Sequence, residues 1–349
     1  MAEENLPIIP LPGAELTDSR SNGGRIVGEM VLGTLALSRA VQEPRFRIGA
    51  HEFCEPDYRQ ILLWAADSQV TPDQFVQKLH WMEYQNWDDG CVSNSANLVG
   101  GKIKQLCLAV ETLNIIPNKW MPGLELRSLD IYDDRGNRDG DAYNPEAAIC
   151  LTDFSSPSPC LESLSFLGCR LRRLRLNGMP NLKELALCYT DLDSLDLAHV
   201  SRLTCLLVHF SPLAKLDLTP VPLLVTLSCM FCELDEIDLS MTPLLTNLDV
   251  CGNQFEALDI RTLRLLEHLS CAHNHLTHLD LSAIPKLRLL WVDDNQLRHL
   301  DLSDVPLLTE LRATKNHLSE LDIRPLGNLK TLSYDKGKTR LIQRPDQNF

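Results

Sequence analysis

A fixed period of 21 residues runs through the second half of this chain and constrains its fold more than any other feature. The stretch LEHLSCAHNHLTHLDLSAIPK, which begins at Leu266, is followed by LRLLWVDDNQLRHLDLSDVPL, with the same residue types at the same offsets. A leucine recurs at this spacing at Leu161, Leu182, Leu203, Leu224, Leu245, Leu266, Leu287, Leu308 and Leu329. A period in the twenties predicts a solenoid, in which each turn buries its apolar face only against neighbouring turns.

The repeated motif, L-x-x-L-x-C/V-x-x-N-x-L-x-x-L-D-L-S-x-x-P-x, covers about half of the chain. It resembles the leucine-rich repeat family, in a variant with LDLS and Pro that is typical of bacteria. The resemblance implies a solenoid of the α/β-repeat type, with a parallel β-sheet on its concave face. It also implies a function in binding rather than catalysis, so we expect the protein not to be an enzyme.

Residues 51–95 are expected to contain a pair of helices that covers the first repeat. Tyr58, Ile61 and Ala65 recur at a spacing of three and four, which places them on one apolar stripe of a helix. Thr71 precedes Pro72, and Gln74 follows at the position that a capping box needs, so a second helix is expected to begin there. Such a pair would shield the apolar core that an open solenoid end exposes.

The other segments are assigned from composition and repeat spacing. Strand-like spacing at 103–108 and 126–131 indicates degenerate repeats, whereas a stretch rich in Gly, Asp, Asn and Pro indicates an inserted loop. That loop is either functional or a disordered insertion, and the region 25–50 fits either a short helix or a pair of strands. The resulting organisation is a flexible arm (1–24), a mainly helical N-terminal cap domain (25–95), degenerate repeats (96–160) with an inserted loop (135–160), leucine-rich repeats (161–334) and a C-terminal cap or tail (335–349).

Charge and cysteine usage restrict the partners and the compartment. The net charge is −14, and residues 1–160 carry −10 of it. An acidic surface repels nucleic-acid phosphates and anionic lipids, so we expect neither nucleic acid nor membrane as a partner, but another protein, possibly basic. The 12 cysteines show no disulfide framework, and the N-terminus lacks the pattern of a secretory signal. Together these features predict a cytoplasmic protein.

Side chains within each repeat are expected to alternate across a short strand at positions three to seven. Positions four and six then point into the core, and positions three, five and seven point outward onto the concave wall. Position nine resembles the family's asparagine ladder at Asn253, Asn274, Asn295 and Asn316. Position fifteen is Asp in seven repeats, from Asp196 to Asp322. We interpret these acids as hydrogen-bonding local backbone at a turn, in preference to calcium ligands, which would need more oxygens around one point.

Two groups of outward side chains are candidates for contact with a partner, because exposed aromatic, Met and Arg side chains dominate binding hot spots. The first lies along one rim and the adjoining wall, and the second surrounds a tryptophan in a later repeat. The alternative is that the aromatic side chains fold back over the turn or meet the N-terminal domain. The candidate residues are Tyr189, Leu207, His209, Phe210, Met230, Phe231, Asp249, His268, His273, Leu289, Trp291, Asp293, Asp294 and Arg312.

No catalytic, metal or cofactor site is predicted. Cys229 and Cys232 have the spacing of a redox or metal pair, but Cys229 falls on a core position and Cys232 on the asparagine position. His278 and His299 should stack on adjacent turns, but a zinc site needs four converging ligands. The most concrete function is a bacterial inhibitor such as a toxin-neutralising immunity protein. The alternatives are a secreted effector whose export segment is 1–24 and, less favoured, an enzyme that uses the 135–160 insertion.

Overall fold

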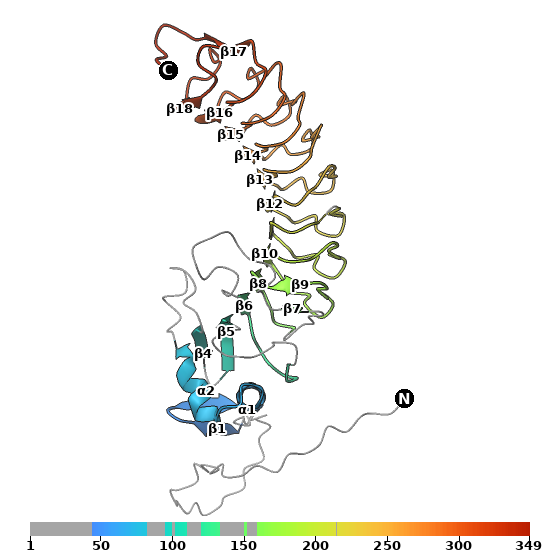
Figure 1. Cartoon of the computed structure of the whole chain (residues 1–349), viewed down its shortest axis with the longest axis vertical. Helices are drawn as coiled ribbons and strands as arrows, with labels where there is room; N and C mark the ends of the chain where they lie inside the picture. Colours follow the sequence, from blue (N-terminus) through green and yellow to red (C-terminus); the bar gives the residue numbers. More distant parts are fainter. Residues whose placement is uncertain are drawn as a thin grey trace, which may run out of the picture.

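The protein, seen in a computed structural model, is an arc built from stacked turns of chain. Strands line the inner side of the arc, and the connecting turns are stacked along its outer side (Figure 1). The structure describes residues 44–81, 95–99, 102–109, 120–132, 150–151, 159–213 and 215–349. The predicted arm (1–24) and most of the predicted insertion (135–160) lie outside the described residues.

One sheet of 13 strands runs along the arc and confirms the predicted solenoid. Neighbouring strands are parallel, except that β4 and β5 are antiparallel. The register advances by one repeat per strand, so that Leu206 pairs with Leu227 and Leu227 with Leu248. In sheet order, the strands are β3 (His80–Trp81), β4 (Ser95–Val99), β5 (Lys102–Ala109), β6 (Ser128–Tyr132), β8 (Ser163–Leu167), β10 (Glu184–Cys188), β11 (Cys205–His209), β12 (Thr226–Met230), β13 (Asn247–Asp249), β14 (His268–Ser270), β15 (Leu289–Trp291), β16 (Glu310–Arg312) and β18 (Thr331–Ser333).

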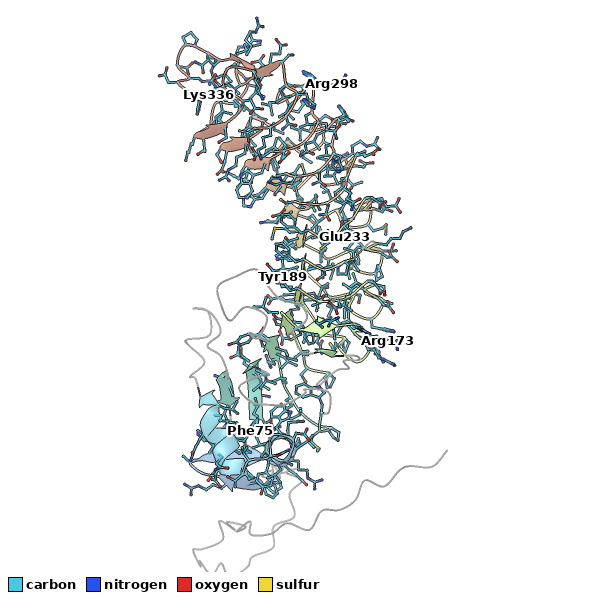
Figure 2. All side chains as sticks on the ribbon, viewed as in Figure 1. Phe75, Arg173, Tyr189, Glu233, Arg298 and Lys336 are labelled. Carbon is cyan, nitrogen blue, oxygen red and sulfur yellow. The ribbon has the colours of Figure 1, made fainter. Side chains whose placement is uncertain are left out.

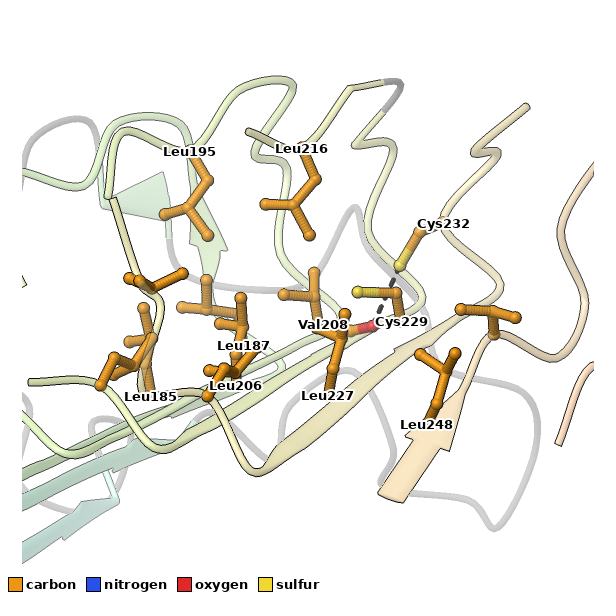
Figure 3. Packing of buried hydrophobic residues seen from close by; sticks show 14 of the residues in the cluster. Leu185, Leu187, Leu195, Leu206, Val208, Leu216, Leu227, Cys229, Cys232 and Leu248 are labelled. Carbon is orange, nitrogen blue, oxygen red and sulfur yellow. Dashed lines mark hydrogen bonds between the residues drawn. The ribbon is translucent and has the colours of Figure 1, made fainter. Parts of the chain in front are cut away.

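The core consists of the inward positions of each strand together with the leucines of the turns. Figure 3 shows Leu206 and Leu227 side by side in consecutive turns, with Val208 and Cys229 following them. All four side chains are fully or almost fully buried. Burying one such aliphatic side chain contributes about 1.5–3 kcal/mol, so each turn stabilises the fold mainly through its two neighbours.

The position-nine residues form the predicted ladder. The Asn274 side-chain amide donates from Nδ2 to the carbonyl of Val250, at 2.9 Å, and its Oδ1 accepts from the Phe255 amide, at 3.1 Å. Asn253, Asn295 and Asn316 repeat this arrangement. In an earlier repeat, Cys232 occupies the same position and its thiol donates to the carbonyl of Val208, at 3.0 Å (Figure 3). The ladder therefore pairs backbone groups that the core would otherwise leave unsatisfied.

The position-fifteen aspartates hold the turns, as the sequence indicated. In each of these repeats Oδ1 accepts a hydrogen bond from the backbone amide two residues later, as Asp280 does from Ser282, at 3.0 Å. The same bond occurs at Asp196, Asp217, Asp238, Asp259, Asp301 and Asp322. A hydrogen bond from the Ser282 side chain, together with that from the Ser282 amide, lowers the pKa of Asp280. The acid column thus has a complete local explanation without a metal.

Two helices close the first end of the solenoid. α1 (Glu55–Asp67) and α2 (Pro72–Lys78) enclose the apolar side chains of Trp64 and Phe75, whose rings lie 5.9 Å apart. Figure 2 labels Phe75 at this end of the molecule. α2 begins at Thr71 with the capping box that the sequence predicted. A hairpin of β1 (Arg45–Ile48) and β2 (His51–Cys54) precedes them, so the described part of the undecided 25–50 region begins this pair of strands.

Buried polar side chains of α1 connect this cap to the sheet. Asp57 Oδ1 accepts from the amide of Ile103 in β5, at 2.9 Å, and Gln60 Oε1 accepts from the amide of Met121, at 2.8 Å. Asp57 is 1% exposed. Burial raises the pKa of its carboxyl to about 6, against the lowering effect of the backbone hydrogen bonds and of Lys104 and Lys102.

The far end of the solenoid is covered by the C-terminal residues. β19 (Arg340–Ile342) pairs with β17 (Glu320–Asp322), and Gln347 Nε2 donates to the carbonyls of Ile323 and Leu326, at 2.9 Å each. A further small pair joins β7 (Cys150–Leu151) to β9 (Arg170–Leu171), so part of the predicted insertion is a strand rather than a loop. Within the described ranges, no helix has the length and apolarity needed to cross a bilayer.

Candidate functional site

Position eight of each repeat, directly after the strand, adopts the left-handed backbone conformation. The φ angles are 55° at Tyr189, 51° at Phe210 and 54° at Phe231, and glycines hold the same position at Gly168 (72°) and Gly252 (70°). In each case the amide donates to a carbonyl of the next turn, as that of Phe210 does to Met230, at 2.9 Å. Bulky residues rarely adopt this conformation, and such strain is concentrated at functional sites.

Tyr189, Phe210 and Phe231 form one continuous stack, which we call the aromatic column. The rings of Tyr189 and Phe210 are 4.6 Å apart with a 2° interplanar angle, and those of Phe210 and Phe231 are 4.8 Å apart with a 6° angle. The stack ends on Gly252, where any β-carbon would overlap the Phe231 ring. Phe210 and Phe231 remain 41% and 44% exposed, so the rings cover one another's faces but present their edges outward.

The same rim continues past Gly252 as a row of charged side chains. His273 Nδ1 lies 3.1 Å from Asp294 Oδ2, and Lys315 Nζ lies 3.3 Å from the same oxygen. All three residues adopt the left-handed conformation of the aromatic column. Position eight is therefore divided into an aromatic half and a charged half, with the glycine between them.

The wall beside the aromatic column is apolar and rich in sulfur. Met230 is half-buried, as are Leu207 and Cys188. His209 joins three strands, because its Nε2 lies 2.8 Å from Ser228 Oγ and its Nδ1 lies 3.7 Å from Cys188 Sγ. Burial lowers the pKa of His209, against the raising effect of Asp249, so the ring is neutral at pH 7 and adds little charge to this surface.

The second group centres on Trp291 in β15. The Arg312 guanidinium lies over the Trp291 ring, 4.3 Å from its centroid. Glu310 Oε1 accepts both from Trp291 Nε1, at 2.9 Å, and from Arg312 Nε, at 2.9 Å. The three side chains hold one another in place, so a partner would meet a preorganised aromatic and cationic surface.

The remaining candidate side chains differ in the hydrogen bonds that they already form within the wall. Asp293 already accepts from the amide and hydroxyl of Thr314, at 2.9 and 2.6 Å. Asp249 accepts from the amide of Cys251, at 3.0 Å. His268 is exposed and its Nδ1 lies 3.1 Å from Asn247 Nδ2, and Leu289 is half-buried beside it in the next strand. The two aspartates are thus partly engaged within the wall.

The candidate residues lie in two groups in the structure. The aromatic column and its sulfur-rich wall lie on β10 to β12, and the Trp291 group lies on β14 to β16. Sequence reasoning missed Glu310, which links Trp291 to Arg312. The signal was present, because Glu310 stands in the position-three column one strand after Leu289.

The thiols near this surface are poorly suited to nucleophilic chemistry. Burial raises the pKa values of Cys188 and Cys205, and it raises that of Cys251 to about 11. The thiolate is the reactive form, so these groups are largely unreactive at neutral pH. In the part of the chain that the structure describes, no group of three or more His, Cys, Asp or Glu side chains is placed to hold a metal ion.

Comparison with known proteins places this architecture among solved structures. No protein-family model matches the sequence, and neither does any curated protein. A leucine-rich-repeat protein of Leptospira interrogans is similar in structure, with a TM-score of 0.54, 21% identity, and coverage of 63% of this chain and 57% of that one. The functional domain of InlJ from Listeria monocytogenes has a TM-score of 0.43, 21% identity, and coverage of 69% and 62%. This chain therefore spans less than two thirds of either of those two chains.

The Leptospira structure is the one of the two that overlaps well enough to compare folds. It shares with this chain a solenoid of stacked parallel strands. The 21-residue period, the inward leucines and the asparagine ladder are the sequence and structural elements of the same architecture. The protein therefore has the fold of a leucine-rich-repeat solenoid.

Proposed function

We propose that this protein recognises another protein through the inner wall of its solenoid and has no catalytic activity. The observation that carries the proposal is the aromatic column. Three consecutive repeats place a large ring on a backbone conformation that costs free energy, where glycine serves in the flanking repeats. Those rings leave their edges exposed instead of filling the core. Contact with a partner would therefore offset the free-energy cost of this backbone conformation.

The surroundings of the column support a protein partner. Aromatic and arginine side chains dominate binding hot spots, which are surrounded by near-neutral contacts that exclude water. Tyr189, Phe210 and Phe231 supply the apolar anchor, and the Trp291–Arg312 pair supplies a second anchor three strands further on. A concave wall of this length offers room for a standard interface of roughly 1,600 Å².

The finer proposal is a bacterial cytosolic inhibitor that occludes its target, such as a toxin-neutralising immunity protein. Its support is electrostatic, because the chain carries a net charge of −14. Such a charge accelerates association with a basic target and makes the association rate depend on salt.

Binding by the wall is tested with paired variants in a pull-down against the captured partner. Phe231→Ala combined with Trp291→Ala removes both anchors and is expected to lower affinity at least a hundredfold, with a melting temperature within a few degrees of the unaltered protein. Leu307→Ala is the matched control, since Leu307 is also exposed, at 38%, but lies outside the wall. Unchanged binding by the double variant would move the interface elsewhere.

The inhibitor proposal is tested by co-expression with the protein encoded by the neighbouring gene. Growth arrest by that protein alone, relieved by this chain and not by the double variant, would support occlusion. Normal growth with the neighbouring protein expressed alone would remove the immunity function while leaving the binding proposal intact.

A further inference from the structure

A second exposed apolar surface lies on the opposite edge of the sheet from the aromatic column. Leu223, Val225, Met241 and Leu244 are 45%, 36%, 47% and 40% exposed, and we call them the flank patch. Leu223 and Leu244 directly precede the first leucine of their repeats, and Leu265 continues their row in the next turn. Contiguous exposed apolar side chains mark interaction sites. We therefore expect this patch to bind something other than the proposed partner of the inner wall.

Cations border the flank patch at both ends. In the row that holds Leu223, Leu244 and Leu265, the preceding repeat has Arg202 and the following repeat has Lys286. Arg264 is adjacent to Leu265 and exposed. Arg202 donates to the Asn181 amide oxygen, at 2.9 Å, and none of these three cations forms an ion pair with any residue of the described ranges. The occupant should therefore present apolar side chains with carboxylates on either side.

A second copy of the patch fits this description poorly. In a two-fold pairing, the two rows would run antiparallel, which places Arg202 of one copy against Lys286 of the other. Like charges brought together in this way oppose association. The charge pattern therefore favours an acidic segment over self-association.

The N-terminal residues of this chain have the complementary pattern. The run Leu6 to Pro12, LPIIPLP, is apolar throughout. Glu3 and Glu4 precede it, and Glu15 and Asp18 follow it, with no Lys or Arg before Arg20. So apolar a run is unusual in a solvated segment.

The dimensions of the two features agree. The prolines favour a polyproline II conformation, in which Leu6 and Ile9 lie on one side about 9 Å apart. Two turns of the solenoid, from Leu223 to Leu265, span about 10 Å.

We propose that residues 3–18 of this chain dock on the flank patch, with the apolar run on the leucines and the acids beside Arg202, Arg264 and Lys286. The arm then covers the flank of the central repeats and leaves the inner wall open. This contact is independent of the proposed partner binding, because the two surfaces lie on opposite edges of the sheet.

Limited proteolysis of the full chain with a glutamyl endopeptidase tests the docking. Cleavage after Glu15, followed by mass spectrometry, is expected to be at least tenfold slower in the unaltered chain than in a Leu223→Asp, Leu244→Asp variant. Leu307→Asp is the matched control, since Leu307 has the same repeat position and 38% exposure, and it should cleave as slowly as the unaltered chain. Equal cleavage rates in all three proteins would overturn the proposal.

A carbodiimide crosslink provides a second measurement that does not depend on how the variants fold. In the monomeric product of the unaltered chain, Lys286 is expected to be joined to Glu3, Glu4, Glu15 or Asp18. Absence of any such link would overturn the proposal. Links found only between two chains would also overturn it, and would assign the patch to the arm of a second copy.

Discussion

Replacing Gly252 by alanine tests how closely the aromatic column packs against the backbone at its end. Gly252 has a φ of 70°, and a β-carbon there would overlap the Phe231 ring. The left-handed conformation costs an alanine about 1–2 kcal/mol. Displacing the ring adds about 0.5–1.5 kcal/mol for the lost stacking on Phe210, together with about 1–3 kcal/mol for overpacking. We expect Gly252→Ala to lower the free energy of unfolding by about 3–5 kcal/mol.

The steric and conformational parts are separated by a double-mutant cycle measured by urea denaturation. In a Phe231→Ala background the ring is absent, so Gly252→Ala should cost only the conformational part, about 1–2 kcal/mol. Gly337→Ala is an additional control, because Gly337 also has a positive φ, 88°, and nothing lies near its missing β-carbon. A coupling energy below about 0.5 kcal/mol would refute the proposed close contact between Phe231 and Gly252.

Three further predictions follow from the ladder, the cap and the wall. Asn274→Ala leaves the Val250 carbonyl and the Phe255 amide without their side-chain partner, and should destabilise the protein by about 2–4 kcal/mol in urea denaturation. Because burial raises the folded-state pKa of Asp57 to about 6, the folded state holds this proton more tightly than the unfolded state. This contribution to the free energy of unfolding, up to about 3 kcal/mol, is present at pH 3–4 and is lost as the pH rises through 6. Asp57→Asn should remove this pH dependence, as measured by comparing unfolding at pH 4 and pH 7. Cys251, with a pKa of about 11, should alkylate with iodoacetamide at pH 8 at least a hundredfold more slowly than a free thiol, as measured by mass spectrometry.

Much of the fold could be predicted because every repeat has the same residue types at the same positions, which fixes the register of the strands. The 21-residue spacing assigned strands to positions three to seven, and this assignment is confirmed in β8, β10, β11 and β12. The capping box at Thr71 was also readable, because it depends on residues only three positions apart. The strand at Cys150 was not predicted, since Cys150 lies outside the repeat pattern and its partner Arg170 is 20 residues away.

The columns of the candidate residues could be aligned from the sequence, but the geometry of their side chains could not. Column alignment showed that Tyr189, Phe210 and Phe231 follow one another, but whether they fold over the turn or stack depends on the left-handed backbone at position eight. Glu310 was overlooked because its role depends on a diagonal contact with Trp291 and not on its own column. The flank patch was not predicted, because the residue before the first leucine of a repeat varies from Arg202 to Leu223, Leu244 and Lys286 and so forms no repeated pattern.

The sequence by itself determined the solenoid, its register, the asparagine ladder and the turn aspartates. Each of these features is a local pattern that recurs in neighbouring repeats, so it can be recognised in the sequence without knowledge of the overall structure. Only the tertiary structure decided which outward side chains act together. Stacking the turns brings residues 21 positions apart into contact, and small differences in size and charge then divide the rim at Gly252 into an aromatic half and a charged half. The core positions had no such freedom, because every turn must bury the same apolar face.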